Sequence, residues 1–343
     1  MHARVLGDSD LTSPAAQGGR ETGGPRIAVL IPCHNEAATV AKVVADFRRV
    51  LPRAAVYVYD NNCDDETAAV AAKAGAHVRR APLRGKGNVV RRMFSDVEAD
   101  LYLLVDGDDT YDAASAPMML ARLVSEGLDM VSGARVSSDQ AAYRRGHRTG
   151  NRVLTALVRA IFGRQFEDML TGYRVFSRRF VKSFPAHSEG FEIETELTVH
   201  TLQMRLPSAE VETPYGARPD GSASKLSTIR DGLRILRMIG LLVREERPLQ
   251  FFSLVTLIAA VLSGLLVAPV VIDYLATGYV PRYPSLIVSV GLGLVALLSF
   301  ACGLVLDTVS RARLEQRRLA YLNLAGPQDL TLEEVSSVRQ IVG

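Results

Sequence analysis

Residues 101–109 read Leu-Tyr-Leu-Leu-Val-Asp-Gly-Asp-Asp, an apolar run that stops abruptly in carboxylates. The apolar part predicts a buried strand, because it is short and has polar residues on both sides. Along an extended chain, residues i and i+2 point the same way, so Asp106 and Asp108 can face one ion. Carboxylate oxygens suit Mg²⁺ or Mn²⁺, which commonly bridge carboxylates to substrate phosphates. The alternative is a solvated acidic turn.

Strands and helices alternate around this stretch. The predicted strands are 27–31, 55–59, 76–79 and 101–105, and the predicted helices are 37–50, 67–74 and 86–97. Further along the chain we predict a strand at 129–132, a strand and loop at 168–176, a helix at 189–203 and an edge strand at 209–213. This alternation predicts an α/β fold, with a mostly parallel, Rossmann-like sheet covered by helices on both faces. In such sheets ligands bind beyond the carboxyl ends of the strands.

Two more predicted strand ends carry polar groups. The segment Pro32-Cys33-His34-Asn35-Glu36 follows the first strand, and Asp60-Asn61-Asn62 follows the second. Each segment alone could be a plain turn or a helix cap, where Asn and Asp are common. Together with the acidic pair, however, they place polar side chains at three strand ends, on the edge where a nucleotide would bind.

These segments resemble family 2 glycosyltransferases with the GT-A fold, in the branch of dolichyl- and polyprenyl-phosphate glycosyltransferases. The resemblance covers roughly residues 26–243. It implies a nucleotide-sugar site that includes Pro32, His34, Glu36, Asp60, Asn61, Asp106, Gly107 and Asp108, with the metal on Asp106 and Asp108. Members often carry Asp-Asp-Gly-Ser or Asp-Asp-Asn-Ser where this chain has Asp60-Asn61-Asn62-Cys63, so the preference for a base stays open.

Two further segments resemble parts of the family's donor site. Arg84-Gly85-Lys86-Gly87 opens a predicted helix, and a helix N-terminus with a lysine is an anion site. The alternative is a tight loop with an exposed Lys86. Near residue 220, Arg218 and Lys225 flank a Gly- and Ser-rich stretch that resembles a loop closing over the nucleotide diphosphate; the alternative is a simple linker.

The acceptor side is predicted from arginines. Arg135, Arg148 and Arg152 resemble the arginines that hold the lipid phosphate in this family. The planar guanidinium suits that task because it binds phosphate oxygens in pairs. For residues 144–159 the competing interpretation is a basic face resting on anionic lipid.

Two carboxylates complete the predicted catalytic set of Asp108, Arg135, Asp168 and Glu192. Asp168 precedes Thr171-Gly172-Tyr173-Arg174, and Glu192 lies in Gly190-Phe191-Glu192-Ile193-Glu194; both segments resemble family motifs. A phosphate monoester, with a second pKa of about 6, is largely dianionic at neutral pH. We therefore expect these carboxylates to orient groups or act electrostatically, with a general-base role as the alternative.

Two apolar runs near the C-terminus predict a membrane anchor. Residues 249–272 and 285–306 contain no Lys, Arg, Asp or Glu, and each exceeds the roughly 20 residues that a helix needs to cross the hydrocarbon core. Buried core helices are the alternative. An amphipathic helix at 225–247 suits the lipid interface, or packs against the soluble domain. Arg244 and Arg247 before the spans, and four arginines after them, put both ends in the cytoplasm.

The predicted organisation is a disordered tail (1–24), a cytoplasmic catalytic domain (25–224), an interfacial helix (225–247), a transmembrane hairpin (248–307) and a cytoplasmic tail (308–343). Residues 1–24 lack the apolar core of a signal peptide. The three cysteines are too widely spaced for a zinc site or a disulfide framework, and a net charge of +3 argues against nucleic-acid binding.

The predicted function is metal-dependent, inverting transfer of a hexose from a nucleotide-sugar to a polyprenyl phosphate. UDP-glucose is the first candidate donor, because the two-span layout resembles bacterial polyprenyl-phosphate glucosyltransferases; UDP-GlcNAc and GDP-mannose stay open. A processive polysaccharide synthase is disfavoured, since the chain has no Trp for the usual Gln-x-x-Arg-Trp segment. A non-catalytic nucleotide-sugar sensor is the other alternative. The resemblance also allows a homo-oligomer packed through the spans.

Overall fold

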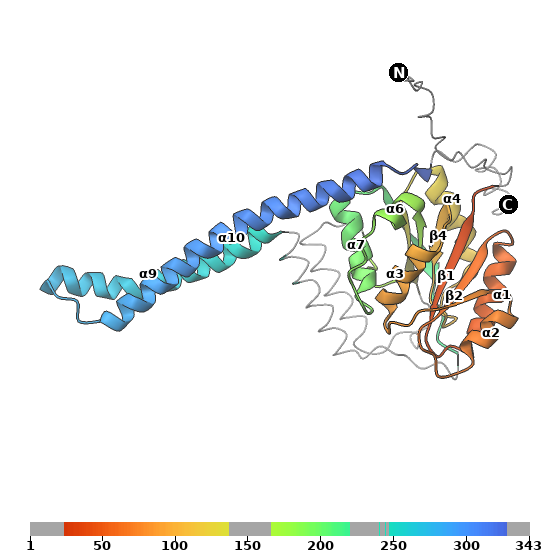
Figure 1. Cartoon of the computed structure of the whole chain (residues 1–343), viewed down its shortest axis with the longest axis horizontal. Helices are drawn as coiled ribbons and strands as arrows, with labels where there is room; N and C mark the ends of the chain where they lie inside the picture. The colour runs from red at the N-terminus through yellow and green to blue at the C-terminus, as the bar shows by residue number, and fades with distance from the viewer. Residues whose placement is uncertain (1–23, 137–165, 220–239, 241–243, 245–246, 328–343) are drawn as a thin grey trace, which may run out of the picture.

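The computed structural model describes residues 24–136, 166–219, 240, 244 and 247–327 (Figure 1). Several predicted features lie outside these residues. They are the N-terminal tail up to residue 23, Arg148, Arg152, Lys225, most of the interfacial helix and the last sixteen residues of the chain.

A seven-stranded sheet forms the centre of the globular domain. Its strands are β1 (Ile27–Cys33), β2 (Ala55–Asp60), β3 (His77–Arg80), β4 (Leu101–Leu104), β5 (Met130–Val136), β6 (Arg174–Ser177) and β7 (Ser208–Pro214). Their order across the sheet is β3-β2-β1-β4-β6-β5-β7. All neighbours pair in parallel except β6, which is antiparallel to both β4 and β5. The prediction of a mostly parallel α/β sheet is confirmed, and β6 makes it mixed.

Helices cover both faces of the sheet, as predicted (Figure 1). On one face lie α1 (Val40–Val50), α2 (Thr67–Lys73) and α4 (Ala116–Ser125), with the short 3₁₀ helix η1 (Ala113–Ser115) before α4. On the other face lie α3 (Lys86–Asp96), α6 (Arg178–Ser183) and α7 (Ile193–Met204). In α1 the residues Val40, Val43, Val44 and Phe47 recur at helical spacing and are buried against the sheet. Helices α4 and α6 were not among the predicted elements.

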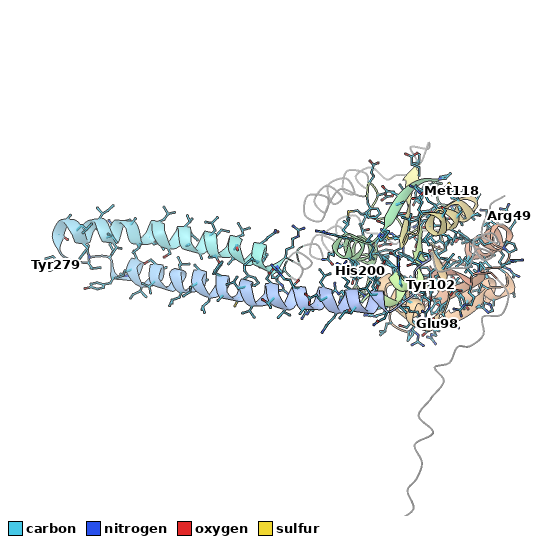
Figure 2. All side chains as sticks on the ribbon, turned by 90° about the horizontal axis from the view of Figure 1, so that it is seen from above. Arg49, Glu98, Tyr102, Met118, His200 and Tyr279 are labelled. Atoms are coloured by element: carbon cyan, nitrogen blue, oxygen red, sulfur yellow. The ribbon has the colours of Figure 1, made fainter. Side chains whose placement is uncertain are left out.

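Two long helices, α9 (Pro248–Thr277) and α10 (Tyr283–Leu322), project from the domain as an antiparallel hairpin (Figure 1). Figure 2 shows side chains pointing outward along this hairpin as far as Tyr279 near its tip. Only 11% and 17% of the most apolar windows of α9 and α10 are buried, which argues against buried core helices. Both helices are long and apolar enough to cross a membrane.

The two helices pack through small residues. Ala259 of α9 and Ser289, Ala296 and Gly303 of α10 are the buried positions at this contact, apart from Pro248 and Val270. The Ser263 hydroxyl donates to the Ser289 carbonyl at 2.7 Å. Small residues let helix backbones approach closely, which is the usual basis of association within a bilayer.

Helix α10 does not end where its apolar run ends. The second predicted span stopped at residue 306, and 308–343 were assigned to a tail, but the helix continues to Leu322. In its last turns, Leu314 and Tyr321 pack against the hydrophobic cluster that includes Phe180 of α6. The Tyr321 hydroxyl donates to Oδ2 of the fully buried Asp129, at 2.7 Å. We call Asp129, Ser177, Arg179, His200 and Tyr321 the docking corner.

Candidate active site

The carboxyl ends of three parallel strands meet at one edge of the sheet. Cys33 at the end of β1 pairs with Asp60 at the end of β2, and the Val105 amide after β4 donates to the Leu30 carbonyl at 3.1 Å. The Asn61 amide in turn donates to the Cys33 carbonyl at 2.9 Å. The polar segments predicted to follow these strands therefore do lie together, and we call this edge the active edge.

The three acids after β4 have different surroundings. Asp108 is only 3% exposed; its Oδ1 accepts from the Thr110 hydroxyl at 2.6 Å, and its Oδ2 forms an ion pair with Arg218 at 2.5 Å. Asp106 pairs with Lys86 at 2.5 Å. Asp109 has a positive φ of 59°, and its carboxylate pairs with Lys42 of α1 at 2.6 Å. Asp106 and Asp108 thus form ion pairs with Lys86 and Arg218 of the site, whereas Asp109 pairs with Lys42 of α1.

The glycine between the two acids has a packing role. A Cβ on Gly107 would lie 2.7 Å from the Cys33 sulfur, closer than real contacts allow. The Gly107 carbonyl accepts from the Thr39 hydroxyl at 2.6 Å. This close approach places Asp106 and Asp108 against the end of β1.

Burial sets the electrostatics of the acidic pair. It raises the pKa of Asp108, and the nearby charge of Asp106 raises it further, while Arg218 and Thr110 act in the opposite direction. A bound cation would favour the charged form of this carboxyl. Among the described residues there is no cluster of three or more metal-ligating side chains. Two carboxylates nevertheless fit Mg²⁺ or Mn²⁺, which complete their coordination with phosphate oxygens and water.

Lys86 begins α3 and is enclosed by acids. Its side chain is 9% exposed and pairs with Asp106 and, at 2.6 Å, with Glu194 of α7. Burial alone would lower the pKa of Lys86, but the charges of Asp106 and Glu194 outweigh burial and raise it. The alternative of a loop with an exposed lysine is therefore wrong.

The glycines beside Lys86 let α3 abut the segment before α7. A Cβ on Gly87 would lie 2.2 Å from the Ser188 carbonyl oxygen, and Gly85 has a φ of 121°. The amides of Gly87 and Asn88 donate to the carbonyls of Gly190 and Glu189. These amides are already used, so any anion binding at this helix end would depend on Lys86.

Glu194, rather than Glu192, is the carboxylate of α7 that reaches the acidic pair through Lys86. Burial raises the pKa of Glu194, and Lys86 opposes that effect. Glu192 accepts from the Gly190 amide at 3.1 Å, within its own turn. The predicted helix began at 189, whereas α7 begins at Ile193. That later start puts Glu194 in the first turn of α7, whereas Glu192, selected because its segment resembles a family motif, directly precedes the helix.

At the donor side, Asn61 and Asp60 hold loops together. The Asn61 side chain donates to the carbonyls of Ala81 and Leu83, at 3.1 and 2.7 Å, and accepts from the Gly85 amide at 2.8 Å. Asp60 accepts from the Cys63 amide at 2.8 Å. The predicted contact of Asn61 with a nucleotide therefore competes with three bonds that fix the loop before α3.

Three other predicted donor-site residues lie nearby. His34 contacts the Asn61 carbonyl at 3.0 Å through Nδ1 and the exposed Arg84 at 3.1 Å through Nε2. Glu36 is buried, and its amide donates to the Thr67 hydroxyl at 2.8 Å. Pro32 is half-buried near the end of β1. All three lie at the active edge.

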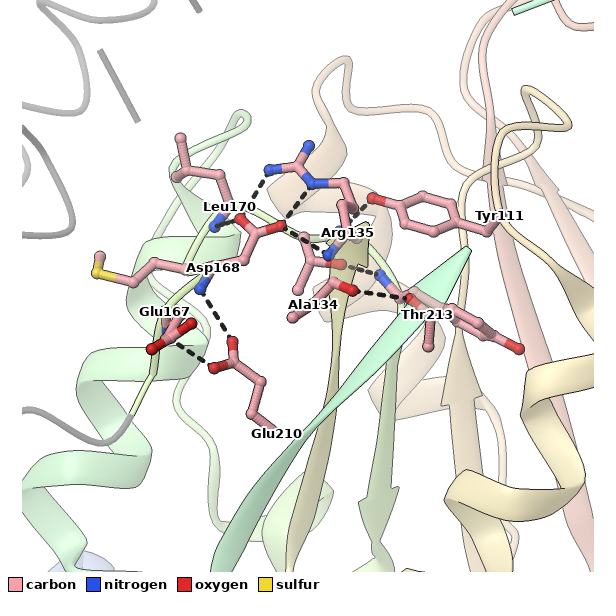
Figure 3. Close-up of polar contacts among 12 residues, drawn as sticks. Tyr111, Ala134, Arg135, Glu167, Asp168, Leu170, Glu210 and Thr213 are labelled. Atoms are coloured by element: carbon pink, nitrogen blue, oxygen red, sulfur yellow. Dashed lines mark hydrogen bonds and ion pairs between the residues drawn. The ribbon is translucent and has the colours of Figure 1, made fainter. Parts of the chain in front are cut away.

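Arg135 and Asp168 form a bidentate ion pair at the end of β5 (Figure 3). Nε and Nη2 of Arg135 lie 2.6 and 2.8 Å from the two oxygens of Asp168. The Leu170 amide also donates to Asp168, and Glu210 of β7 accepts from the Asp168 amide at 2.9 Å (Figure 3). Burial would lower the pKa of Arg135, but Tyr111 and Asp168 outweigh it and raise the pKa well above its usual value.

The loop between Asp168 and β6 joins this pair to the acidic pair. A Cβ on Gly172 would lie 2.5 Å from Oδ2 of Asp106, so the loop passes directly against that carboxylate. The buried Arg174 holds the loop from below by donating to the carbonyls of Met169 and Thr171, at 2.6 and 3.1 Å. Sequence reasoning placed Arg174 only in a motif and missed this structural role.

Comparisons with known proteins agree with this architecture. Residues 28–184 match the sequence profile of glycosyl transferase family 2. The chain is 38% identical to glycosyltransferase AglJ of Haloferax volcanii over 229 residues, 66% of this chain and 75% of the relative. It is 28% identical to a dolichyl-phosphate hexose transferase of the same organism over 221 residues, 64% of this chain and 95% of the relative.

Among solved structures, the domain is similar to glucosyl-3-phosphoglycerate synthase of Mycobacterium tuberculosis in complex with Mn²⁺, UDP-glucose and phosphoglyceric acid. That match has a TM-score of 0.53 and 23% identity, and covers 64% of this chain and 80% of the other. At this identity the likeness shows the shared fold. Together with the sequence relatives, the strand-end acids and the GT-A architecture identify the chain as a transferase that belongs to glycosyltransferase family 2.

Proposed function

We propose that this chain transfers a hexose from a nucleotide-sugar to a polyprenyl phosphate, with inversion and with Mg²⁺ or Mn²⁺ at the active edge. One observation carries the proposal. The acidic pair lies against the loop that bears Asp168, the partner of Arg135, in a domain joined to a hairpin long and apolar enough to span a membrane. The relative named dolichyl-phosphate hexose transferase supports this class of acceptor.

The donor would bind at the active edge. Asp106 and Asp108 would hold the divalent ion, which when bound neutralises negative charge on the leaving diphosphate. Lys86 fixes Asp106, because it is enclosed between that carboxylate and Glu194. Arg218 lies beside Asp108 and would supply a guanidinium to the same diphosphate. UDP-glucose is our first candidate donor and GDP-mannose the second.

The acceptor would bind beside Arg135. Its phosphate carries its own negative charge, so the reaction needs alignment more than deprotonation. Both Asp168 oxygens already accept hydrogen bonds from Arg135, and one also accepts from the Leu170 amide. A carboxylate engaged in this way supports an orienting role, in which Asp168 holds the Arg135 guanidinium for the phosphate. Arg148 and Arg152 remain proposed phosphate contacts.

Membrane attachment suits such an acceptor, whose phosphate lies at the headgroup level while its tail stays in the bilayer. The arginines that flank the two apolar helices favour the cytoplasmic side for the catalytic domain. The interfacial helix would then lie on the same surface.

The test is a transfer assay with the purified full-length protein, undecaprenyl phosphate and Mg²⁺ or Mn²⁺. Radiolabelled UDP-glucose, UDP-GlcNAc and GDP-mannose are compared, with Asp108→Asn as the site control. We expect label in the lipid with one donor and its loss with EDTA or in the variant. If folded protein labels no lipid with any of these donors, the proposal fails for them, and a rarer donor, another acceptor or a sensor role takes its place.

A further inference from the structure

Both oxygens of Asp108 are engaged by the chain itself. Oδ1 accepts from the hydroxyl and the amide of Thr110, at 2.6 and 3.3 Å. Oδ2 lies 2.5 Å from Arg218. A metal ion that binds Asp108 must therefore share or replace one of these partners. Thr110 is buried and adjacent in sequence, whereas the Arg218 side chain is 28% exposed and comes from a distant segment.

The segment that bears Arg218 is anchored close to Asp108. The Gly216 amide donates to the Thr110 carbonyl at 2.9 Å, and Tyr215 forms an isolated β-bridge with Tyr111. Arg218 is two residues beyond this anchor. Its long side chain can therefore exchange partners by rotating, while the backbone stays attached at Gly216.

The charges near the acidic pair are nearly balanced without metal. Among the described residues, the ion pairs at this site join three carboxylates, those of Asp106, Asp108 and Glu194, to two cations, Lys86 and Arg218. Lys86 is buried and pairs with two of the acids, so moving its side chain away would break two ion pairs. A divalent ion added alone would bring two more positive charges beside Arg218, and like charges at this range repel strongly. A nucleoside diphosphate supplies anionic oxygens that offer Arg218 a new partner.

We infer that Arg218 occupies Oδ2 of Asp108, where the metal would bind, until a nucleoside diphosphate offers its guanidinium another partner. Metal and nucleotide therefore increase each other's affinity, and this positive linkage depends on Arg218. This inference rests on the proposed function, because it needs a metal on Asp108. Linkage is reciprocal, so metal raises nucleotide affinity by the same factor that nucleotide raises metal affinity. The arrangement disfavours metal binding to the empty enzyme.

The test measures Mn²⁺ binding by the electron paramagnetic resonance signal of the free ion. Full-length protein in detergent is titrated with Mn²⁺ alone, and then in the presence of UDP or GDP. In Arg218→Gln we expect Mn²⁺ alone to bind about 10-fold more tightly than in the wild type, and the linkage factor to shrink by a similar amount. Arg218→Lys, which keeps a cation, should stay close to the wild type.

Lys42→Gln is the matched control, since it removes the same charge from a cation that pairs with Asp109. We expect it to change Mn²⁺ affinity less than about 2-fold. If Arg218→Gln binds Mn²⁺ alone no more tightly than the wild type does, the inference is wrong. Should that variant not fold, Arg218→Met serves in its place.

Failure of the proposed function looks different. In that case Asp108→Asn would bind Mn²⁺ as the wild type does, with or without nucleotide, and sugar transfer would not depend on metal. Metal-dependent transfer together with an unchanged Arg218→Gln titration would overturn the linkage alone.

Discussion

Asp108 at the active edge and Asp129 at the docking corner are both buried aspartates paired with an arginine, yet their surroundings differ. Asp129 is fully buried and accepts from Arg179 at 2.5 and 3.0 Å, from the Ser177 hydroxyl at 2.7 Å and from Tyr321 at 2.7 Å. Arg179 is held in turn over the Tyr321 ring, 4.6 Å from its centroid. Asp108 receives one contact from the partly exposed Arg218 and two from Thr110.

The difference indicates what each pair is for. Asp129 has four charged or hydroxyl donors on two oxygens, which makes it a fixed junction between β5, α6 and α10. At Asp108 both oxygens have partners among the described residues, but the one cation in that set is the partly exposed Arg218, and burial raises the pKa of this carboxyl in spite of it. A buried charge that is only partly satisfied costs stability, and such sites are retained where they have a function. The active edge is therefore suited to bind a further cation, whereas the carboxylate of Asp129 at the docking corner already has all its hydrogen-bond donors from the chain.

The largest expected effect separates activity from stability at the active edge. Asp108→Asn should lower transfer by about 100- to 1000-fold, because it removes a charge from the proposed metal site that would stabilise the leaving diphosphate. Its free energy of unfolding should be no lower than that of the wild type, since the variant removes a buried carboxylate with a raised pKa. Urea unfolding followed by circular dichroism, alongside the transfer assay, checks both parts. A marked loss of stability would mean that Asp108 also stabilises the fold, which would contradict the proposed difference between Asp108 and Asp129.

The matched change at the docking corner should have the opposite outcome. Asp129→Asn leaves Arg179 without its carboxylate and should lower the free energy of unfolding by about 3 kcal/mol. Its transfer rate per folded molecule should stay within about 3-fold of the wild type, because Asp129 directly precedes β5, away from the strand ends that carry the acids. The same two measurements apply. A stable but inactive Asp129→Asn would contradict the division between the two regions.

Sequence reasoning located the active edge better than the docking corner, and the cause is the range of the contacts. The strand before Asp106, the alternation of elements and the polar strand ends are local patterns, and each appears in the structure. The bond between Tyr321 and Asp129 joins residues 192 positions apart, which no local pattern encodes. The apolar run also ends at residue 306, while helix α10 continues for four more turns to Leu322.

Within the active edge, the features that sequence reasoning missed also come from non-local contacts. Glu192 was selected because its segment resembles a family motif, and the structure adds Glu194, whose carboxylate pairs with Lys86. The contact of Asn61 with a nucleotide stays a prediction, and the structure adds that its side-chain amide binds a loop some twenty residues further along the chain. The antiparallel direction of β6 follows from its pairing with both β4 and β5, which composition does not reveal.

A pH experiment extends the comparison, because protonating His200 would place an unfavourable positive charge at the docking corner, whereas a cation is favoured at the active edge. His200 is buried against Phe180 and Phe184, with ring centroids at 5.4 and 5.3 Å (Figure 2 shows its place on the side of the domain that faces the hairpin). Neither ring nitrogen has a hydrogen-bond partner among the described residues. Burial, and then the charge of Arg317, lowers the pKa of His200 to about 3.

The sign of the expected effect follows from that depressed pKa. Between pH 6.5 and about 3 the unfolded chain protonates this histidine while the folded chain does not, so stability falls as pH falls. From pH 7 to pH 5 the loss should be about 2 kcal/mol for this residue. Urea midpoints of wild type and His200→Gln at both pH values isolate it, because the other histidines are common to both proteins. An equal pH dependence in the two proteins would show that His200 is protonated in the folded state.

The smallest expected effect tests the contact that joins the helical hairpin to the catalytic domain. Tyr321→Phe keeps the ring over Arg179 but removes the hydroxyl that donates to Asp129, and should lower the free energy of unfolding by about 1 kcal/mol. Tyr279→Phe is the matched control, since Tyr279 is exposed at the hairpin tip and should change stability by less than about 0.5 kcal/mol.

Tyr321→Ala removes the ring as well and should cost about 1 kcal/mol more than Tyr321→Phe, through the lost cation–π contact and packing. If the Phe and Ala variants are equally destabilised, the hydroxyl alone holds α10 to the domain. If Phe matches the wild type, the ring alone holds it, and Asp129 is complete with Arg179 and Ser177. In either case the two sites differ, because the exchangeable partner of Asp108 is the charged Arg218, whereas Asp129 would lose only the hydroxyl of Tyr321.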